Sequence, residues 1–326
     1  MNRRTMLTRL LGAGMLAGGS LGHAAGQFAA GLPRRLVSLD WGLTEMLLSL
    51  GVVPVGMANV QGFRRNFTAC TLPAAVVDLG LMFQPNLELL WALKPELIII
   101  TPAHAALRAS LEKVAPTLTL GRYRASPVPY LAARAETQQL AAILGREASG
   151  ANALAQVDAA VAQARRQLMD APATHIAPLY MVRFVDETHL RVYSTHSLYG
   201  EIMTLLGLHN AWPDTSHAAA FSTVGFEALW SAPEAALIYL KPLPVPVAKL
   251  MERSVLWQAM PFKNPGRMLA LPSVPAEGGI VSAAYFAQVL SDVLVASADQ
   301  QRKPANAAAL LRATPDLRRA SAQGTA

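Results

Sequence analysis

One segment of the sequence occurs twice in related form, once in each half of the chain. The first copy, NLELLWALKPELIIIT at residues 86–101, reads as a short helix, a proline that ends it and an apolar strand. The second copy, FEALWSAPEAALIYL at residues 226–240, keeps the same order. A fold for this chain must therefore place two similar helix–strand units in equivalent surroundings.

A second feature recurs in the same order relative to the first. One predicted helix contains Glu45 and is closed by Gly51 six residues later, and another contains Glu201 and is closed by Gly207. Glycine directly after a helix is typical of its C-terminal cap. Because two paired features recur in register, the sequence predicts two related α/β lobes.

One long amphipathic helix at residues 147–170 separates these lobes. Its apolar residues recur every third or fourth position, which places them on one face over about 30 Å. They are Leu154, Val157, Val161, Ala164 and Leu168. On either side, strands alternate with helices at the spacing of βαβ units. The predicted fold class is α/β, with two Rossmann-like lobes that have central parallel sheets and are joined by this helix.

The N-terminus carries the pattern of an export signal. Arg3 and Arg4 precede an apolar stretch that is too short to span a membrane, and small residues follow around Ala24. The paired arginines also resemble a twin-arginine signal, with an ordinary secretory signal as the alternative. Elsewhere no apolar run approaches the roughly 18 residues of a membrane-spanning helix. We therefore expect a soluble protein exported to the periplasm.

The chain divides into five predicted parts. The last of them is rich in alanine, arginine, proline and glutamine, a composition typical of mobile segments. The parts are a signal peptide at 1–25, an N-terminal lobe at 33–146, a connecting helix at 147–171, a C-terminal lobe at 172–296 and a mobile tail at 297–326.

The positive charge lies mostly outside the predicted lobes. The first 25 residues and the tail from Ser297 each carry +3 of the formal net charge of +7, which leaves +1 for the part between. A nucleic-acid-binding protein carries its basic excess on the folded domain. We therefore expect no nucleic-acid partner.

Motifs of catalytic and metal sites are missing from the sequence. It contains no G-x-S-x-G, P-loop, H-E-x-x-H or C-x-x-C motif, its seven histidines are scattered, and Cys70 is the only cysteine. We expect no assembled nucleophile site, no directly bound metal and no internal disulfide. A secreted α/β hydrolase that uses Asp40, His196 and Ser222 stays as an alternative, although the spacing of these residues gives it no support.

The repeated segments contain an aromatic and an acidic residue at equivalent positions. Trp91 and Trp230 lie on the apolar faces of their predicted helices, so we expect both to pack in the core. Glu88 and Glu227 lie near the helix starts, where a carboxylate favours the positive end of the helix dipole. Two interpretations stay open for these acids: stabilisation of the helix start, or a docking surface with one acid on each lobe.

Several segments together resemble one protein family. RLVSLDWGLTEMLLSLGVVPVG, QPNLELLWALKPELIII and HSLYGEIMTLLGLHNAW are similar to the periplasmic binding proteins that deliver ferric siderophores and cobalamin to ABC importers, most of all to the ferric-hydroxamate (ferrichrome-type) binders. The resemblance covers residues 34–296. It implies a class III periplasmic binding protein with no catalysis and no cofactor. Such a protein is a monomer that holds a ferric chelate between its lobes and delivers it to an inner-membrane permease with its ATPase.

The resemblance also implies docking residues. In the family, one glutamate on each lobe contacts arginines of the permease, and release of the ligand follows docking. Glu227 matches the C-terminal position. Glu112 lies one turn from the N-terminal position, and Glu88 is a further candidate.

The ligand site departs from the family pattern. The hydroxamate binders have an arginine where this chain has Met82, and aromatic residues at or near Asn66, His104 and Ala220. The aromatic cluster before the last helix is replaced by PAEGG, which contains Glu277. The candidate cleft residues are Arg64, Arg65, Asn66, Met82, Phe83, His104, Ala220, Phe221 and Glu277.

Loss of the family arginine affects the expected ligand. It removes a charge-assisted hydrogen bond of about 1.5–3 kcal/mol unless Arg64, Arg65 or Arg122 replaces it. We therefore expect a ferric siderophore, with a hydroxamate type favoured but not ferrichrome in particular. Haem, cobalamin or an unusual siderophore is the alternative ligand, and a sensor that signals through a membrane partner is the alternative role.

Overall fold

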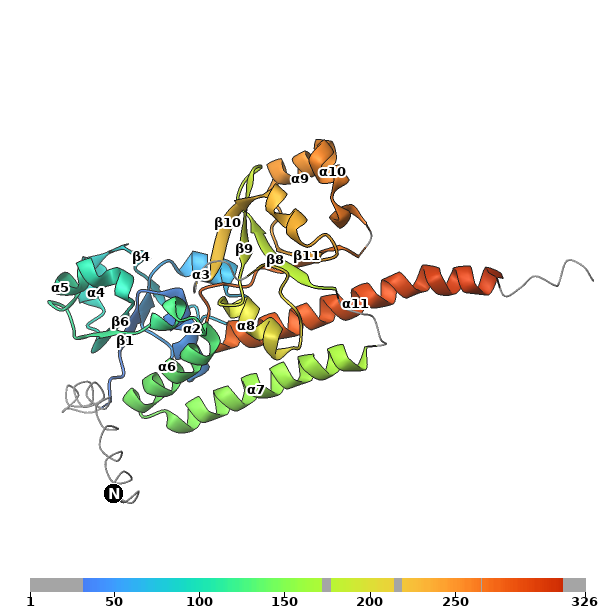
Figure 1. The fold of residues 1–326 in the computed structure, drawn as a ribbon. Coiled ribbons are helices and arrows are strands. Elements are labelled where there is room, and N and C mark those ends of the chain that lie inside the picture. The colour runs from blue at the N-terminus through green and yellow to red at the C-terminus, as the bar shows by residue number, and fades with distance from the viewer. Residues whose placement is uncertain (1–31, 172–176, 214–218, 265, 313–326) are drawn as a thin grey trace, which may run out of the picture.

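Two five-stranded sheets form two lobes above a pair of long helices (Figure 1). The structure is a computed structural model that describes residues 32–171, 177–213, 219–264 and 266–312, with side chains up to residue 299. The export signal predicted at residues 1–25 lies outside the described residues.

The N-terminal lobe is built on a fully parallel sheet, as predicted. The strands are ordered β3-β2-β1-β6-β7, and every neighbouring pair is parallel. The interior strand β6 is at most 1% exposed because helices cover both faces of the sheet. The strands are β1 (Leu36–Ser38), β2 (Gly56–Met57), β3 (Val77–Asp78), β6 (Leu97–Ile100) and β7 (Thr117–Thr119), with a separate hairpin of β4 (Gly80–Leu81) and β5 (Gln84–Pro85). The helices are α2 (Trp41–Ser49), α3 (Val60–Asn66), α4 (Leu87–Ala92), η1 (Pro102–Leu107), α5 (Arg108–Leu111), η2 (Arg122–Ala125) and α6 (Pro129–Ile143).

The C-terminal lobe has a mixed sheet. Its order is β10-β9-β8-β11-β12, in which β8, β11 and β12 are parallel and β9 and β10 are antiparallel to their neighbours. The prediction of a parallel sheet is thus wrong for β9, because a connection of four residues joins β8 to β9 and a parallel crossover needs a dozen or more. β10 pairs antiparallel with β9 and therefore runs in the same direction as β8. The strands are β8 (Leu179–Phe184), β9 (His189–Tyr193), β10 (Phe221–Gly225), β11 (Ala236–Leu240) and β12 (Met268–Leu271). The helices are α8 (Leu198–Leu205), η3 (Phe226–Ser231), α9 (Val245–Arg253), α10 (Val255–Ala259) and η4 (Pro261–Lys263).

The two lobes share a base of two long helices. The predicted connecting helix is α7 (Glu147–Asp170), and α11 (Ile280–Arg312) runs beside it in the same direction (Figure 1). The Gln167 side-chain amide donates a hydrogen bond of 2.8 Å to Asp292 between them. All five residues predicted on the apolar face of α7 are buried. Since α11 continues to Arg312, the backbone of residues 297–312 is helical. The rest of the predicted mobile tail lies outside the described residues, and its mobility stays a prediction.

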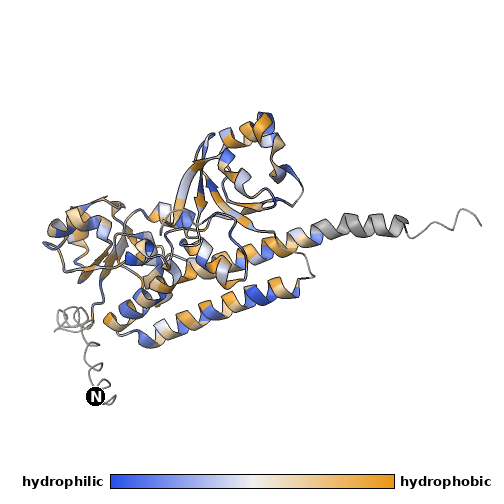
Figure 2. Cartoon of the chain, in the orientation of Figure 1, coloured by the Kyte–Doolittle hydropathy of each residue, from blue (hydrophilic) through white to orange (hydrophobic). Residues whose placement is uncertain are grey.

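The apolar character of α11 comes from its role in the core. Residues Ile280–Asp299 have a mean hydropathy of 1.6 and are long enough to cross a bilayer, a feature that the sequence reading missed. However, 44% of this stretch is buried inside the protein, and Figure 2 shows apolar residues along both α7 and α11. The contacts of α11 with α7 and α8 identify it as a core helix of the fold.

Glu45 ties the N-terminal lobe to the start of α11. This glutamate lies on α2 and is fully buried. Its carboxylate accepts hydrogen bonds from the Gly279 amide at 2.7 Å, from the Ser282 hydroxyl at 3.0 Å and from the Ser282 amide. Burial raises the pKa of Glu45, and these hydrogen bonds oppose the rise. The carboxylate thereby satisfies N–H groups at the helix start that have no partner within the helix.

Glu201 makes the equivalent contact from the C-terminal lobe to a helix of the N-terminal lobe. It lies on α8 of the C-terminal lobe and accepts hydrogen bonds from the amides of Tyr130 at 2.7 Å and Leu131 at 3.1 Å, at the start of α6. Burial raises the pKa of Glu201 as well, against the effect of both hydrogen bonds. The glutamates of the repeat thus cap helices across the molecule, which gives the repeated spacing a structural reason.

The two repeat tryptophans lie on the surface. Trp91 is 61% exposed and Trp230 is 42% exposed, so the prediction that they pack in the core is wrong. The helices that carry them are only six residues long, and each already buries leucine, Leu90 in α4 and Leu229 in η3. A short helix turns one narrow face inward, and the tryptophans fall outside it.

We expect Glu45→Ala to lower the free energy of unfolding by about 2–4 kcal/mol, because buried donors at the start of α11 lose their acceptor. Glu88→Ala is the matched control, since Glu88 is exposed in the first turn of α4 and its loss costs at most about 0.5 kcal/mol. Urea denaturation measures both values. Equal effects for the two variants would show that the Glu45 contacts do not stabilise the fold.

Candidate functional site

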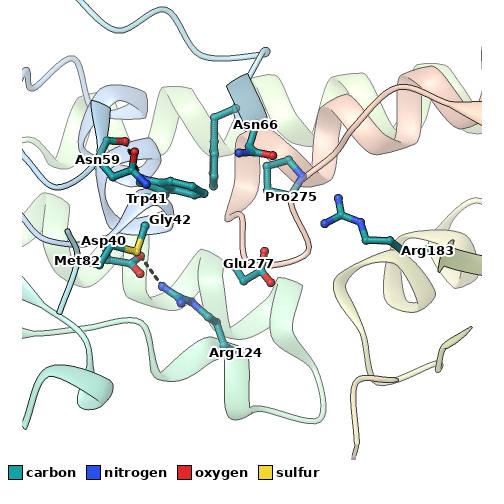
Figure 3. Close-up of a pocket in the computed structure, with 11 residues that line it drawn as sticks. Asp40, Trp41, Gly42, Asn59, Asn66, Met82, Arg124, Arg183, Pro275 and Glu277 are labelled. Atoms are coloured by element: carbon teal, nitrogen blue, oxygen red, sulfur yellow. Dashed lines mark hydrogen bonds and ion pairs between the residues drawn. The ribbon is translucent and has the colours of Figure 1, made fainter. Parts of the chain in front are cut away.

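A cavity of about 350 Å³ lies between the lobes (Figure 3). The loops that follow β1, β2 and β7 form one wall, β8 contributes from the C-terminal lobe, and the segment before α11 forms the floor. We call this cavity the cleft. The cleft is lined by Asp40, Trp41, Gly42, Asn59, Asn66, Phe67, Met82, Arg124, Arg183, Pro275 and Glu277.

An ion pair between Arg124 and Asp40 forms one side of the cleft. The Arg124 guanidinium donates to the Asp40 carboxylate, which also accepts from the Leu43 amide at 3.1 Å and so caps α2. Burial is the largest single effect and lowers the pKa of Arg124, but the Asp40 carboxylate and Tyr123 together outweigh it, so the net pKa lies above its usual value. The positive charge of Arg124 is therefore fixed and balanced within the protein.

A close contact holds the floor of the cleft against α2. The Tyr123 hydroxyl donates a hydrogen bond of 2.8 Å to the backbone carbonyl of Glu277. A Cβ atom at Gly42 would lie 2.4 Å from the Tyr123 hydroxyl and 2.5 Å from that carbonyl. Only glycine allows this approach, which joins the N-terminal lobe to the segment before α11. The Glu277 side chain itself is exposed and faces the cleft (Figure 3).

An aromatic wall lies on the other side of the cleft. The Trp41 indole N–H lies 3.2 Å from the backbone carbonyls of both Ala58 and Asn59, and the ring packs edge-on against Phe67 at 6.1 Å. A Cβ atom at Gly62 would lie 2.2 Å from the indole, so glycine is needed for this packing as well. The indole therefore presents a fixed apolar surface to the cleft.

Arg183 reaches the cleft from the C-terminal lobe. It is the fifth residue of β8, is partly buried, and points towards the cleft in Figure 3. Within the described part of the chain, its side chain makes no hydrogen bond or ion pair. Of the two arginines that line the cleft, Arg124 is paired with Asp40, whereas Arg183 forms no ion pair with a described acid.

Three of the residues predicted from the sequence line the cleft. They are Asn66, Met82 and Glu277. Asn66 is held by a hydrogen bond of 2.8 Å from its side chain to the Gly62 carbonyl. Met82 lies between β4 and β5 and packs partly against the core of the N-terminal lobe. Contact of Asn66, Met82 and Glu277 with a ligand stays a prediction.

The remaining predicted residues do not line the cleft. Arg64 and Arg65 are exposed on α3, and Arg122 is exposed on η2, so these arginines do not supply the missing cleft charge. Phe83 stacks on the buried ring of His104 at 4.9 Å beside the cleft.

Ala220 and Phe221 also lie outside the lining. The Ala220 carbonyl accepts a backbone hydrogen bond of 3.0 Å from Ser194, and the Phe221 ring packs against Tyr193 and beneath the Arg191 guanidinium at 4.7 Å. These contacts occupy both residues at the edge strand β10, away from the cavity.

The three candidate docking acids are exposed. Glu88 lies in the first turn of α4 and Glu227 in the first turn of η3. Glu112 differs from them, because Arg108 at 2.7 Å and the Thr117 hydroxyl at 2.8 Å bind its carboxylate and lower its pKa. Glu88 and Glu227 have no hydrogen bond or ion pair to other described residues and are open to a partner.

The structure supports neither a metal cluster nor the hydrolase alternative. In the described ranges, no group of three or more histidine, cysteine, aspartate or glutamate side chains lies close enough to hold a metal ion. Asp40 is bound to Arg124, His196 contacts the Pro127 carbonyl at 3.1 Å, and Ser222 lies in β10 paired with β9. The three hydrolase candidates thus have separate structural contacts.

The sequence contained a signal for most of the cleft residues that were missed. Asp40, Trp41, Asn59 and Arg124 follow the carboxyl ends of parallel strands, where open α/β sheets bind ligands. Arg183 gave no such signal, because it lies inside a predicted strand and only the arrangement of the lobes directs it to the cleft.

The chain is similar to known proteins over most of its length. The profile of a family described as periplasmic binding protein matches residues 36–275. The iron(3+)-hydroxamate-binding protein FhuD of Escherichia coli (strain K12) is 28% identical over 293 residues, 90% of this chain and 96% of that protein. The Fe(3+) dicitrate-binding periplasmic protein FecB of the same strain is 27% identical over 237 residues, 70% of this chain and 73% of that protein. The structure of the siderophore-binding protein FhuD from Vibrio cholerae bound to Fe3+–Desferal is 28% identical with a TM-score of 0.73, and the match covers 81% of this chain and 98% of that one.

We expect Arg124→Gln to lower the free energy of unfolding by about 2–4 kcal/mol, because the Asp40 carboxylate stays buried without its cation. Arg108→Gln is the control, since the Arg108–Glu112 pair is about half exposed and contributes no more than about 0.5 kcal/mol. Urea denaturation separates the two values. A cost for Arg124→Gln no larger than that of the control would contradict a structural role for the buried pair.

Proposed function

The chain belongs to the periplasmic binding protein family, and from this we propose that it is the substrate-binding subunit of an ABC importer. It captures a ferric siderophore in the cleft and delivers it to an inner-membrane permease and its ATPase. The resemblance to this family expected from the sequence is confirmed by the profile match. Relatives named for binding iron(3+) hydroxamate and Fe(3+) dicitrate support an iron chelate as the ligand.

The balance of charge in the cleft supports a hydroxamate siderophore. Two acids, Asp40 and Glu277, and two bases, Arg124 and Arg183, line the cavity. A ferric complex of three hydroxamates is electrically neutral, because three single negative charges balance Fe3+. A ferric tris-catecholate carries three negative charges and would need an excess of basic residues to replace its lost hydration. This balance is the observation that favours a neutral chelate.

The remaining parts of the proposal follow from the same family. The export signal predicted at residues 1–25 directs the protein to the periplasm, where a soluble binding subunit meets the permease. The chain acts as a monomer and without catalysis, since its task is capture and release. Haem and cobalamin are the alternative ligands that the binding experiment includes.

The docking surface combines an acid and an exposed aromatic residue on each lobe. Glu88 is followed by Trp91 on α4, and Glu227 is followed by Trp230 on η3. The exposure of both tryptophans fits an interface, because tryptophan is enriched at protein–protein interfaces. A partner would cover apolar ring surface that is open to water in this structure. Glu112 is the weaker candidate, since Arg108 already neutralises it.

Titration of the mature protein with a ferric tris-hydroxamate is expected to quench tryptophan fluorescence with a dissociation constant of about 1 μM or tighter. Trp41→Phe should remove most of the quenching, because Trp41 lines the cleft. Trp257→Phe is the control, since Trp257 is 6% exposed in the core of the C-terminal lobe. Ferric catecholates, haem and cobalamin complete the panel. Saturable binding of none of these ligands would contradict the proposed function.

We expect Glu227→Ala to reduce iron uptake by cells carrying the importer by about tenfold, because the C-terminal lobe loses its charge contact with the permease. Chelate binding by the purified variant should be unchanged. Glu252→Ala, an exposed acid on α9, is the matched control and should leave uptake at the level of the unaltered protein. Uptake of radioactive ferric chelate measures the effect. Unchanged uptake for Glu227→Ala would remove this residue from the docking surface.

A further inference from the structure

We propose that Arg183 is the residue that hydrogen-bonds the oxygen atoms of the ferric chelate, and that the recognising guanidinium has moved to the C-terminal lobe. This inference rests on the proposed function and names the residue that sets its ligand preference. The family resemblance led us to expect an arginine in the N-terminal lobe, at the position of Met82. Met82 and Arg183 line the same cleft, and they face it from opposite sides (Figure 3).

The strand pairing gives Arg183 its direction. In the register of β8 and β9, Arg183 lies opposite Arg191, so both side chains leave the same face of the sheet. On this face, Tyr193 and Tyr199 are buried and pack edge-on at 4.7 Å. The two rings fill the space beneath the sheet, so the Arg183 guanidinium does not fit there and extends into the cleft instead.

The charges of the neighbouring arginines already have partners. Arg191 lies over the ring of Phe221 at 4.7 Å, and Arg124 is paired with Asp40 through Nη2, although its buried Nε has no partner among the described residues. Arg183 makes no hydrogen bond or ion pair with the described part of the chain, although it is partly buried. A guanidinium that is partly removed from water without an acceptor keeps its capacity to bind oxygen atoms of a ligand.

The chemistry of the guanidinium suits a hydroxamate complex. Its N–H groups form a planar fork that can bind two oxygen atoms at once, and it is more weakly hydrated than an ammonium group. The oxygen atoms that coordinate iron in a tris-hydroxamate lie in adjacent pairs and retain partial negative charge. Trp41 and Phe67 offer an apolar surface across the cleft for the rest of the chelate. The ligand would thus be held between an aromatic wall on one lobe and a hydrogen-bond donor on the other.

The test is titration of the purified protein with a ferric tris-hydroxamate. We expect Arg183→Gln to weaken binding by about 10- to 100-fold, because the ligand loses charge-assisted hydrogen bonds. Arg64→Gln is the matched control, since Arg64 is exposed on α3 outside the cleft, and it should change the affinity by less than about twofold. Because the Arg183 side chain makes no internal hydrogen bond, the variant should unfold within about 2 °C of the unaltered protein.

A second variant tests whether the donor has changed lobes. Adding Met82→Arg to Arg183→Gln returns an arginine to the family position, and we expect it to recover binding by about tenfold over Arg183→Gln alone. Unweakened binding by a folded Arg183→Gln variant, or an equal loss in Arg64→Gln, would overturn the inference while leaving the proposed function intact. If the unaltered protein bound none of the chelates, the proposed function would fail first and the inference with it.

Discussion

The arrangement of the lobes depends on one buried and one partly buried carboxylate that cap helices across the molecule. Glu45 on α2 binds the start of α11, and Glu201 on α8 binds the start of α6. Each carboxylate gives up water, which raises its pKa, and receives backbone N–H groups that would otherwise be unsatisfied. Each contact requires one particular placement of the two halves, so the pair fixes the lobes in a way that apolar packing alone does not.

The cleft inherits its shape from these contacts. The segment that carries Glu277 leads directly into α11. The Glu45 contacts hold this segment at Gly279, and the Tyr123 hydrogen bond holds it two residues earlier, at Glu277. Gly42 allows this approach because it lacks a side chain. The same elements that join the lobes therefore position the residues that line the cavity. A change at Gly42 would disturb the fold and the site together.

The sequence predicted features that local pattern controls and missed those that depend on the meeting of distant segments. The helix α7, the buried strand β6 and the two-lobe architecture followed from periodicity and repetition. The glutamate repeat was recognised, but its cause, a hydrogen bond to the other half of the chain, was not visible. Trp91 was misplaced because a short helix buries only one of its apolar residues. Arg183 was missed because its direction is set by sheet register and lobe packing.

The crossed caps also bear on how binding free energy is used. In a receptor whose binding-competent form is a minor state, the apparent dissociation constant is the intrinsic one divided by the population of that form. The two caps, the shared helical base and the Gly42 contact all favour the one arrangement of the lobes described above. Contacts that raise the population of a binding-competent form reduce the free energy lost to conformational selection. For a protein that scavenges a scarce solute, such contacts would bring the apparent affinity nearer to the intrinsic one.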